Sequence, residues 1–261
     1  MPHPPDFTLH GLHALLSGIK ERGYNFRFFT ENTIAAHGDC LLRHDIDLNL
    51  DMAVQVADLE QSLAIESTYF VLTTSEAYNT FSRSGRHSVS QILRCGHRLG
   101  LHFDPFVWLE STVSLEEAIL REARAIEDAF SISVETFSFH RPGTLGNSGP
   151  PRVGGLVNAY APAFTEDICY SSDSMGWWRY GSFVESAAFR DCRSVQLLLH
   201  PIWWTSAEVM HPGRRLDELV DESHKHFRAS LIQTITPYAA YTGDSLGGPQ
   251  WPPMEILRPS E

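Results

Sequence analysis

The stretch Leu41-Leu42-Arg43-His44-Asp45-Ile46-Asp47 decides the fold and the site that we expect. An apolar run ends there in ionisable residues, which is typical of a buried strand that stops at the edge of a sheet. Because side chains alternate along a strand with a period of two, the carboxylates of Asp45 and Asp47 lie on the same side of the backbone. Two such charges repel unless a cation or a shared proton compensates them. The motif therefore favours a metal site or a proton-transfer site, and it also suits an Asp-rich turn that caps the next helix.

Length and charge narrow the class of protein. The chain has 261 residues, a formal net charge of −12 and 43% hydrophobic residues. That length suits an α/β barrel built as one domain, and we expect a single domain over residues 1–261. The acidic balance argues against a nucleic-acid groove and against an anionic membrane, both of which need a basic protein face. In addition, no apolar stretch approaches the length of a membrane span. For these two reasons, neither nucleic acid nor a membrane is an expected partner.

The first residues and the cysteines indicate the compartment. Residues 1–6 have neither the basic region nor the apolar region of a secretory signal. Cys40, Cys95, Cys169 and Cys192 are scattered, without a Cys-x-x-Cys pair. They are typical of reduced thiols in a cytosolic protein, so we expect a cytoplasmic location.

Strands and helices alternate along the chain. The expected strands are residues 24–29, 40–45, 67–72, 100–103, 134–139, 167–171 and 194–200. The expected helices are residues 7–22, 49–63, 88–99, 115–130 and 216–234. Residues 142–156 are rich in Gly and Pro and predict a loop, and an extended tail is expected from residue 245. The alternation implies βαβ units and therefore an α/β fold with a parallel sheet.

Ionisable residues follow five of these strands. In such folds the chemistry collects at the carboxyl ends of the strands. Those ends carry Asp45 and Asp47, His102 and Asp104, His140 and Arg141, Asp173, and His200. Each residue alone is also common as a cap, but the set together favours an active site.

Two further histidines near these strands are expected outside the site. His44 alternates away from Asp45 along the strand, so we expect it in the core with its hydrogen bonds satisfied. His97 lies in a Gly-His-Arg turn and is expected at the surface or at a helix end rather than in a metal site.

The strand-end segments resemble the polysaccharide deacetylases of the NodB-homology type, carbohydrate esterase family 4. They are most similar to a divergent branch that is found with surface-polysaccharide and O-antigen (lipopolysaccharide) biosynthesis. The similarity spans roughly residues 38–205. It rests on residues 42–47, 67–70, 96–102, 138–142 and 198–201. The resemblance implies a distorted seven-stranded (β/α) barrel with one divalent metal ion.

The family's first two motifs imply a catalytic base and metal ligands. In the first, Thr-Phe-Asp-Asp, the base corresponds to Asp45. The metal-binding carboxylate falls on Ile46, and Asp47 takes its place. In the second, His-x-x-x-His, the first ligand corresponds to His102, but Phe106 stands at the second ligand position.

The missing ligand has two candidates at the same cluster of strand ends, His140 and Asp104, of which His140 is preferred. Three protein ligands with open positions for water are the arrangement that a catalytic metal requires. Imidazole suits zinc, which we expect here, and cobalt, nickel, manganese and iron are the alternatives.

The remaining motifs imply the other catalytic residues. The Arg-Pro motif matches Arg141, which in the family orients the base. The Asp-x-x-x-Trp motif matches Asp173 and Trp177. The Leu-x-His motif ends on His200, the family's general acid.

The resemblance implies a metal-dependent N-deacetylase acting on an acetamido sugar that is linked to a nucleotide or a lipid. The departure at Phe106 motivates an alternative, a non-catalytic relative that binds a saccharide. An amidohydrolase acting on a non-sugar amide is a third hypothesis, because a fold does not fix a function. The sequence leaves open the sugar, its carrier and the oligomeric state.

Overall fold

The computed structural model describes residues 6–30, 37–142, 149–178, 181–235, 238, 241 and 242. The chain forms two compact units, Met1–Pro212 and Gly213–Glu261. Every residue of the expected site belongs to the first unit. The single domain expected over 1–261 stays a prediction, because much of the second unit, including the expected tail from residue 245, lies outside the described residues.

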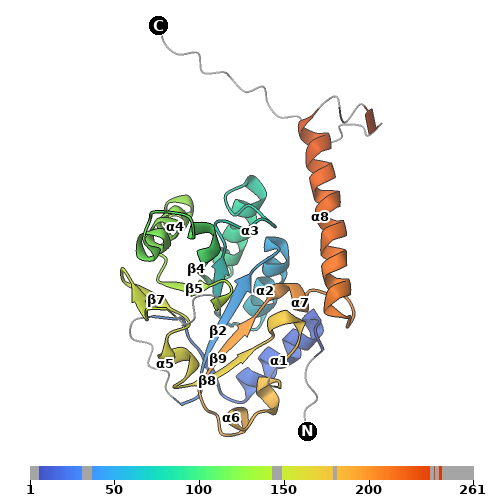
Figure 1. The fold of residues 1–261 in the computed structure, drawn as a ribbon. Helices are drawn as coiled ribbons and strands as arrows, with labels where there is room; N and C mark the ends of the chain where they lie inside the picture. Colours follow the sequence, from blue (N-terminus) through green and yellow to red (C-terminus); the bar gives the residue numbers. More distant parts are fainter. Residues whose placement is uncertain are drawn as a thin grey trace. The chain divides into compact units, whose positions relative to one another are not determined.

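A nine-stranded sheet forms the centre of the first unit (Figure 1). Its strands are β1 (Asn25–Phe26), β2 (Asp39–Ile46), β3 (Thr68–Val71), β4 (Arg98–Phe103), β5 (Thr136–Phe139), β6 (Arg152–Val153), β7 (Leu156–Asn158), β8 (Cys169–Ser172) and β9 (Val195–Leu199). They lie in the order β6-β7-β5-β4-β3-β2-β9-β8, with β1 paired to β2. In this order the seven strands from β7 to β8 are parallel, and β6 is antiparallel to β7. The expected α/β fold with a parallel sheet is confirmed.

Helices precede, connect and follow the strands along the chain. The longer ones are α1 (Leu9–Glu21), α2 (Leu50–Ser62), α3 (Arg83–Arg94), α4 (Leu115–Phe130) and α8 (Pro212–Thr234). The short ones are η1 (Pro105–Trp108), α5 (Pro162–Thr165), η3 (Ser174–Gly176), η4 (Phe183–Glu185), α6 (Ala187–Arg190) and α7 (Pro201–Trp204). Thr8, Asn49, Ser82 and Ser114 cap α1 to α4 by accepting a backbone N–H. Among the described residues, no helix combines the length and the apolar character that a membrane crossing requires.

Strand β2 separates two apolar layers. Cys40 and Leu42 point into the larger core, which lies between the sheet and helices α1 to α4. Leu41 points into a smaller cluster on the inner face. Because side chains alternate along a strand, Arg43 and Asp45 share this inner face with Leu41.

The sheet curls around that inner cluster. Leu41 of β2 and Val157 of β7 belong to the same buried cluster, although three strands separate them in the sheet. Gln196 of β9 also reaches the segment after β7, where its Nε2 donates to Ala159 O at 3.0 Å and to Phe164 O at 2.8 Å. These side-chain contacts bring the two ends of the sheet together around a filled interior.

The structure differs from the expected elements in helix α3 and in the loop after β5. Helix α3 begins and ends earlier than the predicted 88–99, because Ser82 caps its start and Gly96, with φ +93°, follows its end. The predicted loop 142–156 contains β6 and the first residue of β7, which form a hairpin whose turn uses Gly154 and Gly155 at φ +53° and +96°. Residues 143–148 of that loop lie outside the described residues.

Candidate metal and catalytic site

The carboxyl ends of β5, β4, β2 and β9 deliver the expected side chains to one edge of the sheet. Asp45 lies within β2, and Asp47 follows its last residue. His102 lies near the end of β4, while His140 and His200 directly follow β5 and β9. The strands are parallel, so these ends meet at the same edge.

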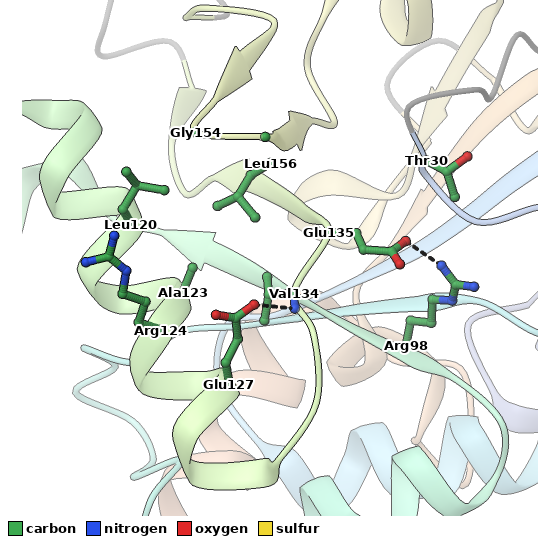
Figure 2. Close-up of a pocket in the computed structure, with 11 residues that line it drawn as sticks. Thr30, Arg98, Leu120, Ala123, Arg124, Glu127, Val134, Glu135, Gly154 and Leu156 are labelled. Atoms are coloured by element: carbon green, nitrogen blue, oxygen red, sulfur yellow. Dashed lines mark hydrogen bonds and ion pairs between the residues drawn. The ribbon is translucent and has the colours of Figure 1, made fainter.

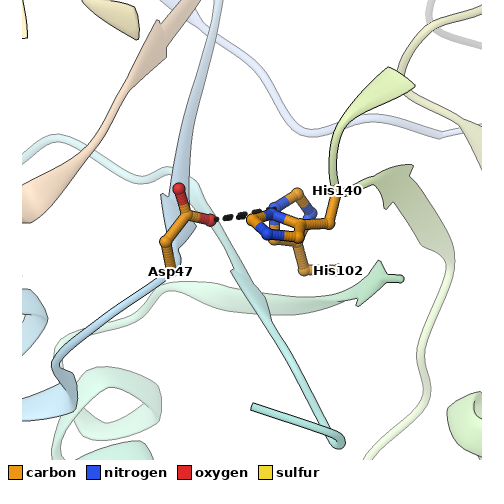
Figure 3. A group of neighbouring side chains, drawn as sticks. All are labelled: Asp47, His102 and His140. Carbon is orange, nitrogen blue, oxygen red and sulfur yellow. Dashed lines mark hydrogen bonds and ion pairs between the residues drawn. The ribbon is translucent and has the colours of Figure 1, made fainter. Parts of the chain in front are cut away.

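Three donor atoms at this edge form a nearly equilateral triangle (Figure 3). Asp47 Oδ1 lies 3.1 Å from His102 Nε2 and 3.3 Å from His140 Nδ1, and the two nitrogens are 3.2 Å apart. Ligands placed tetrahedrally at zinc–nitrogen distances lie about 3.3 Å from one another. The spacing of the three atoms therefore fits a single small divalent ion.

Neighbouring side chains favour the binding of a cation by these three donor atoms. His102 Nδ1 lies 2.7 Å from the buried Ser138 Oγ. When a cation occupies the triangle, Nδ1–H can donate to Ser138 and Nε2 can offer its lone pair to the ion. Burial raises the pKa of Asp47. Hydrogen bonds from His102 and His140 and the charge of His200 outweigh that effect, so the pKa of this carboxyl lies well below its ordinary value. An ionised carboxylate and imidazole lone pairs suit a divalent metal.

Asp45 lies beside the triangle and is 2% exposed. Its Oδ2 accepts a hydrogen bond of 2.8 Å from Arg43 and lies 3.7 Å from His102 Nε2. Its Oδ1 is buried and has no hydrogen-bond partner in the described part of the chain. An orphaned buried acceptor of this kind indicates a position for a water molecule or a ligand.

His200 faces the triangle from β9. Its Nδ1 lies 2.6 Å from Asp173 Oδ1, and its Nε2 lies 3.8 Å from Asp47 Oδ2. Asp173 is fully buried and also accepts from Trp204 Nε1 at 2.7 Å. Burial lowers the pKa of His200, but the Asp173 carboxylate more than compensates and raises it to about 9. His200 is therefore held as an imidazolium whose Nε2–H points at the cluster.

Arg141 has contacts that differ from those expected from the sequence. Its Nη2 lies 3.6 Å from Asp104 Oδ2, and its guanidinium lies 5.4 Å from the ring centre of Phe106. Arg141 was expected to orient Asp45, but the guanidinium that donates to Asp45 belongs to Arg43. The position of Arg43, two residues before Asp45 on one strand, was the signal that could have identified it.

Asp104, the alternative metal ligand, is engaged elsewhere. Its Oδ1 accepts from the backbone N–H of Phe106 at 3.0 Å and caps η1, while its Oδ2 faces Arg141. Phe106, which stands at the family's second histidine position, is 45% exposed. Trp177, the tryptophan of the Asp-x-x-x-Trp motif, is 57% exposed.

The two histidines that were expected outside the site, His44 and His97, both contribute to a buried network behind β2. His44 Nε2 lies 2.6 Å from Glu60 Oε1, which confirms that His44 points away from the site into the core. Its buried Nδ1 has no hydrogen-bond partner among the described residues, so the expectation that its hydrogen bonds are satisfied is wrong. His97 is 3% exposed, so the expected surface position is wrong. Its Nδ1 accepts from Ser67 N and its Nε2 donates to Ala57 O, each at 3.2 Å. The early end of α3 is the reason, because it places His97 directly before β4.

A pocket of about 690 Å³ lies at the opposite end of the sheet (Figure 2). It is lined by Arg98, the first residue of β4, and by Glu135, which precedes β5. These two residues form an ion pair, and Glu127 accepts from Val134 N at 3.0 Å. Arg98, Glu135 and Glu127 therefore already bond to other groups of the protein. The pocket is separate from the cluster around His102.

Comparisons with known proteins find similar folds only. No family model matches the chain, and no curated protein matches it. The solved structures do include similar chains. One is a peptidoglycan deacetylase of Bdellovibrio bacteriovorus, at 14% identity over 82% of this chain and 67% of that chain, with a TM-score of 0.42.

Two further similar structures are enzymes that act on other polysaccharides. A family 4 acetyl xylan esterase from Clostridium thermocellum, solved with a cobalt ion, has 13% identity over 72% of this chain and 84% of that chain (TM-score 0.36). A chitin deacetylase from the fungal pathogen Colletotrichum lindemuthianum has 14% identity over 70% and 81% (TM-score 0.36). These similarities are too distant to assign an activity or a family to this chain.

Proposed function

We propose that this chain is a metal-dependent hydrolase that removes an N-acetyl group from a sugar. The observation that carries the proposal is the triangle of donor atoms from Asp47, His102 and His140, with Asp45 beside it and His200 facing it. The motif resemblance to the carbohydrate esterase family 4 supplies the substrate class, an acetamido sugar of surface-polysaccharide or O-antigen biosynthesis.

Asp47, His102 and His140 are the proposed ligands of one divalent ion. Zinc is proposed because two of the ligands are imidazoles, with cobalt, nickel, manganese and iron as alternatives. When bound, such an ion polarises the acetyl carbonyl and lowers the pKa of a coordinated water molecule.

Two side chains beside the triangle are proposed to carry out the two proton transfers, one as the general base and the other as the general acid. Asp45 is the proposed general base, since its unpartnered Oδ1 is free to take a proton from the attacking water. His200 is the proposed general acid, because its Nε2–H faces the cluster and can protonate the amine as the C–N bond breaks. Asp173 holds the ring of His200 and stabilises its positive charge.

A cytoplasmic location and a nucleotide- or lipid-linked substrate are part of the proposal. Cys40, Cys95, Cys169 and Cys192 are free thiols in the structure, as expected of a protein from a reducing compartment. A disulfide found among these four residues in protein isolated from cells would contradict the location.

The experiment that tests the function is mass spectrometry of acetamido sugars incubated with the metal-loaded protein. Nucleotide-linked, lipid-linked and free sugars are compared. The expected product is the free amine with one equivalent of acetate. Unchanged substrates with a folded, metal-loaded protein would favour a saccharide-binding role, and cleavage of simple amides alone would favour an amidohydrolase.

A further inference from the structure

Arg43 is a fully buried arginine on the inner face of β2, next to the proposed site. Its Nη2 donates to Asp45 Oδ2 at 2.8 Å, and its Nη1 donates to Gln196 Oε1 at 3.0 Å. A buried ion pair contributes little net stability compared with apolar side chains of similar volume. Its presence beside the cluster is therefore better explained by what it does to Asp45.

Gln196 fixes one arm of the guanidinium. Its Nε2 donates to Ala159 O and to Phe164 O, at 3.0 and 2.8 Å. These two bonds determine which end of the amide carries the oxygen, so Oε1 faces Arg43. Gln196 in turn belongs to β9, the strand that also delivers His200.

Two aromatic rings fix the plane of the guanidinium. Its central carbon lies 4.5 Å from the ring centre of Tyr160 and 5.3 Å from that of Phe70. Both distances are within the range of cation–π contacts. The side chain is therefore held by the protein on several sides, independently of Asp45.

This rigid guanidinium determines how the Asp45 carboxylate is presented. Arg43 occupies Oδ2, and Oδ1 has no partner among the described residues. The carboxylate thus has one anchored oxygen and one oxygen available to a substrate or to water.

We propose that Arg43 is the positioning residue of Asp45, which it fixes through one oxygen so that the other stays available as the base. The proposal rests on the proposed function, in which Asp45 takes the proton of the attacking water. It assigns to Arg43 of β2 the task that the sequence resemblance gives to Arg141.

The test compares R43M and R43K with wild type in the metal-loaded protein. We expect R43M to lower kcat by about 100-fold, the usual effect of misplacing a reacting group by about 1 Å. KM and the metal-to-protein ratio stay at the wild-type values. R43K keeps the positive charge but loses the forked guanidinium that reaches both Asp45 and Gln196. Its kcat should therefore lie between those of wild type and R43M. Arg98→Met, at the opposite end of the sheet, is the control and retains wild-type kcat.

A double mutant separates positioning from a general structural role. When two residues act as a unit, substituting both of them lowers the rate little more than substituting one. R43M should therefore leave the residual rate of D45N unchanged. The same fold-loss in the D45N background as in wild type would overturn the proposal.

Substitutions of Tyr160 test the same proposal if R43M does not fold. Tyr160→Leu removes one ring from the guanidinium without touching Asp45, whereas Tyr160→Phe keeps the ring. The leucine variant should lower kcat more than the phenylalanine variant at equal metal content. Equal kcat values for the two variants would overturn the proposal.

A crystal structure of metal-loaded R43K provides a readout that does not depend on activity. We expect the Asp45 carboxylate to be displaced relative to wild type. A superimposable Asp45 would overturn the role of Arg43, even if wild type cleaves acetamido sugars. Wild type that cleaves none of them would overturn the proposed function, and the displacement of Asp45 would still decide the role of Arg43.

Discussion

Asp47 receives hydrogen bonds from two histidines that come from different strands. Its Oδ1 is shared by His102 and His140, whose imidazoles would repel one another if both were protonated. A divalent ion in the triangle removes this conflict, because it takes the place of the inward N–H protons and binds the lone pairs of two neutral imidazoles.

Substitution of any of these three residues tests the ligand set. Asp47→Ala, His102→Ala and His140→Ala should each lower the metal affinity by at least 10–100-fold, since even changes to groups around the ligands have that effect. Metal analysis after equilibrium dialysis measures it, and the exposed His13→Ala is the control. Wild-type metal content in His140→Ala would remove His140 from the set and favour Asp104.

His200 has a role that differs from that of the ligands. His200→Ala should lower kcat by about 10²–10⁴-fold, the range for a general acid, because the leaving amine loses its proton donor. Metal content should stay at the wild-type value. Steady-state kinetics with metal analysis of the same sample measure both. Loss of the metal from this variant would identify His200 as a ligand instead.

Alternation along the strand allowed the shared side of Asp45 and Asp47 to be predicted from the sequence. His140 lies with Asp47 and His102 in the triangle, whereas Asp104 caps η1, so the choice of His140 as the third ligand stays a prediction. The arginine at Asp45 was not predicted, because motif comparison points to Arg141, whereas the contact depends on how the interior around Arg43 is filled.

At the scale of the elements, β4 approaches β3 closely at a glycine. A Cβ on Gly100 would lie 2.6 Å from Cδ1 and Cε1 of Phe70, whose ring also contacts Arg43. Gly100→Ala should therefore lower the free energy of unfolding by about 1–3 kcal/mol, the usual cost of overpacking. Urea denaturation measures it.

Gly18→Ala in α1 is the matched control for Gly100→Ala. Its added Cβ meets nothing within 4 Å, and alanine favours the helix, so this variant should gain about 0.5–1 kcal/mol. Equal effects of the two substitutions would contradict the close packing of β4 on β3.

The buried network of His44, Glu60 and His97 predicts a pH dependence of stability. Burial lowers the pKa of His97 more than the charge of Glu60 raises it. Near pH 6.5 the unfolded chain binds a proton that the folded chain does not, so stability decreases as the pH falls below that value. The slope contributed by one such group is at most about 1.4 kcal/mol per pH unit.

His97→Gln removes this titration. Urea denaturation of metal-free wild type and variant at pH 7, 6 and 5 should show a smaller decrease for the variant. Parallel curves would mean that His97 is protonated equally in the folded and unfolded chains.

Helix α4 has the bounds that the sequence predicts, since Ser114 caps it and acidic residues occupy its first turn. Helix α3 does not, because the pattern of residues 88–99 continues through Gly96, where the backbone turns. The hairpin of β6 and β7 was missed because its strands are only two and three residues long.

For the whole molecule, strand–helix alternation predicted the α/β fold and the edge at which the site forms. The filled interior was not predictable, because Arg43, Gln196 and Tyr160 come from strands and segments far apart in the sequence. Arg43 and Gln196 lie on the neighbouring strands β2 and β9, and Tyr160, which follows β7, reaches Arg43 because the sheet curls. His200 comes to the residues at the end of β2 because β9 pairs directly with β2.

The most direct test of the central claim is a titration of the metal-free protein with zinc or cobalt, in which acetate release from an acetamido sugar nucleotide is measured at each step. The proposed function predicts that the rate rises with added metal, reaches its maximum at one ion per chain and stays at background in the Asp47→Ala variant. Acetate release that is independent of metal, or that is equal in wild type and Asp47→Ala, would contradict it.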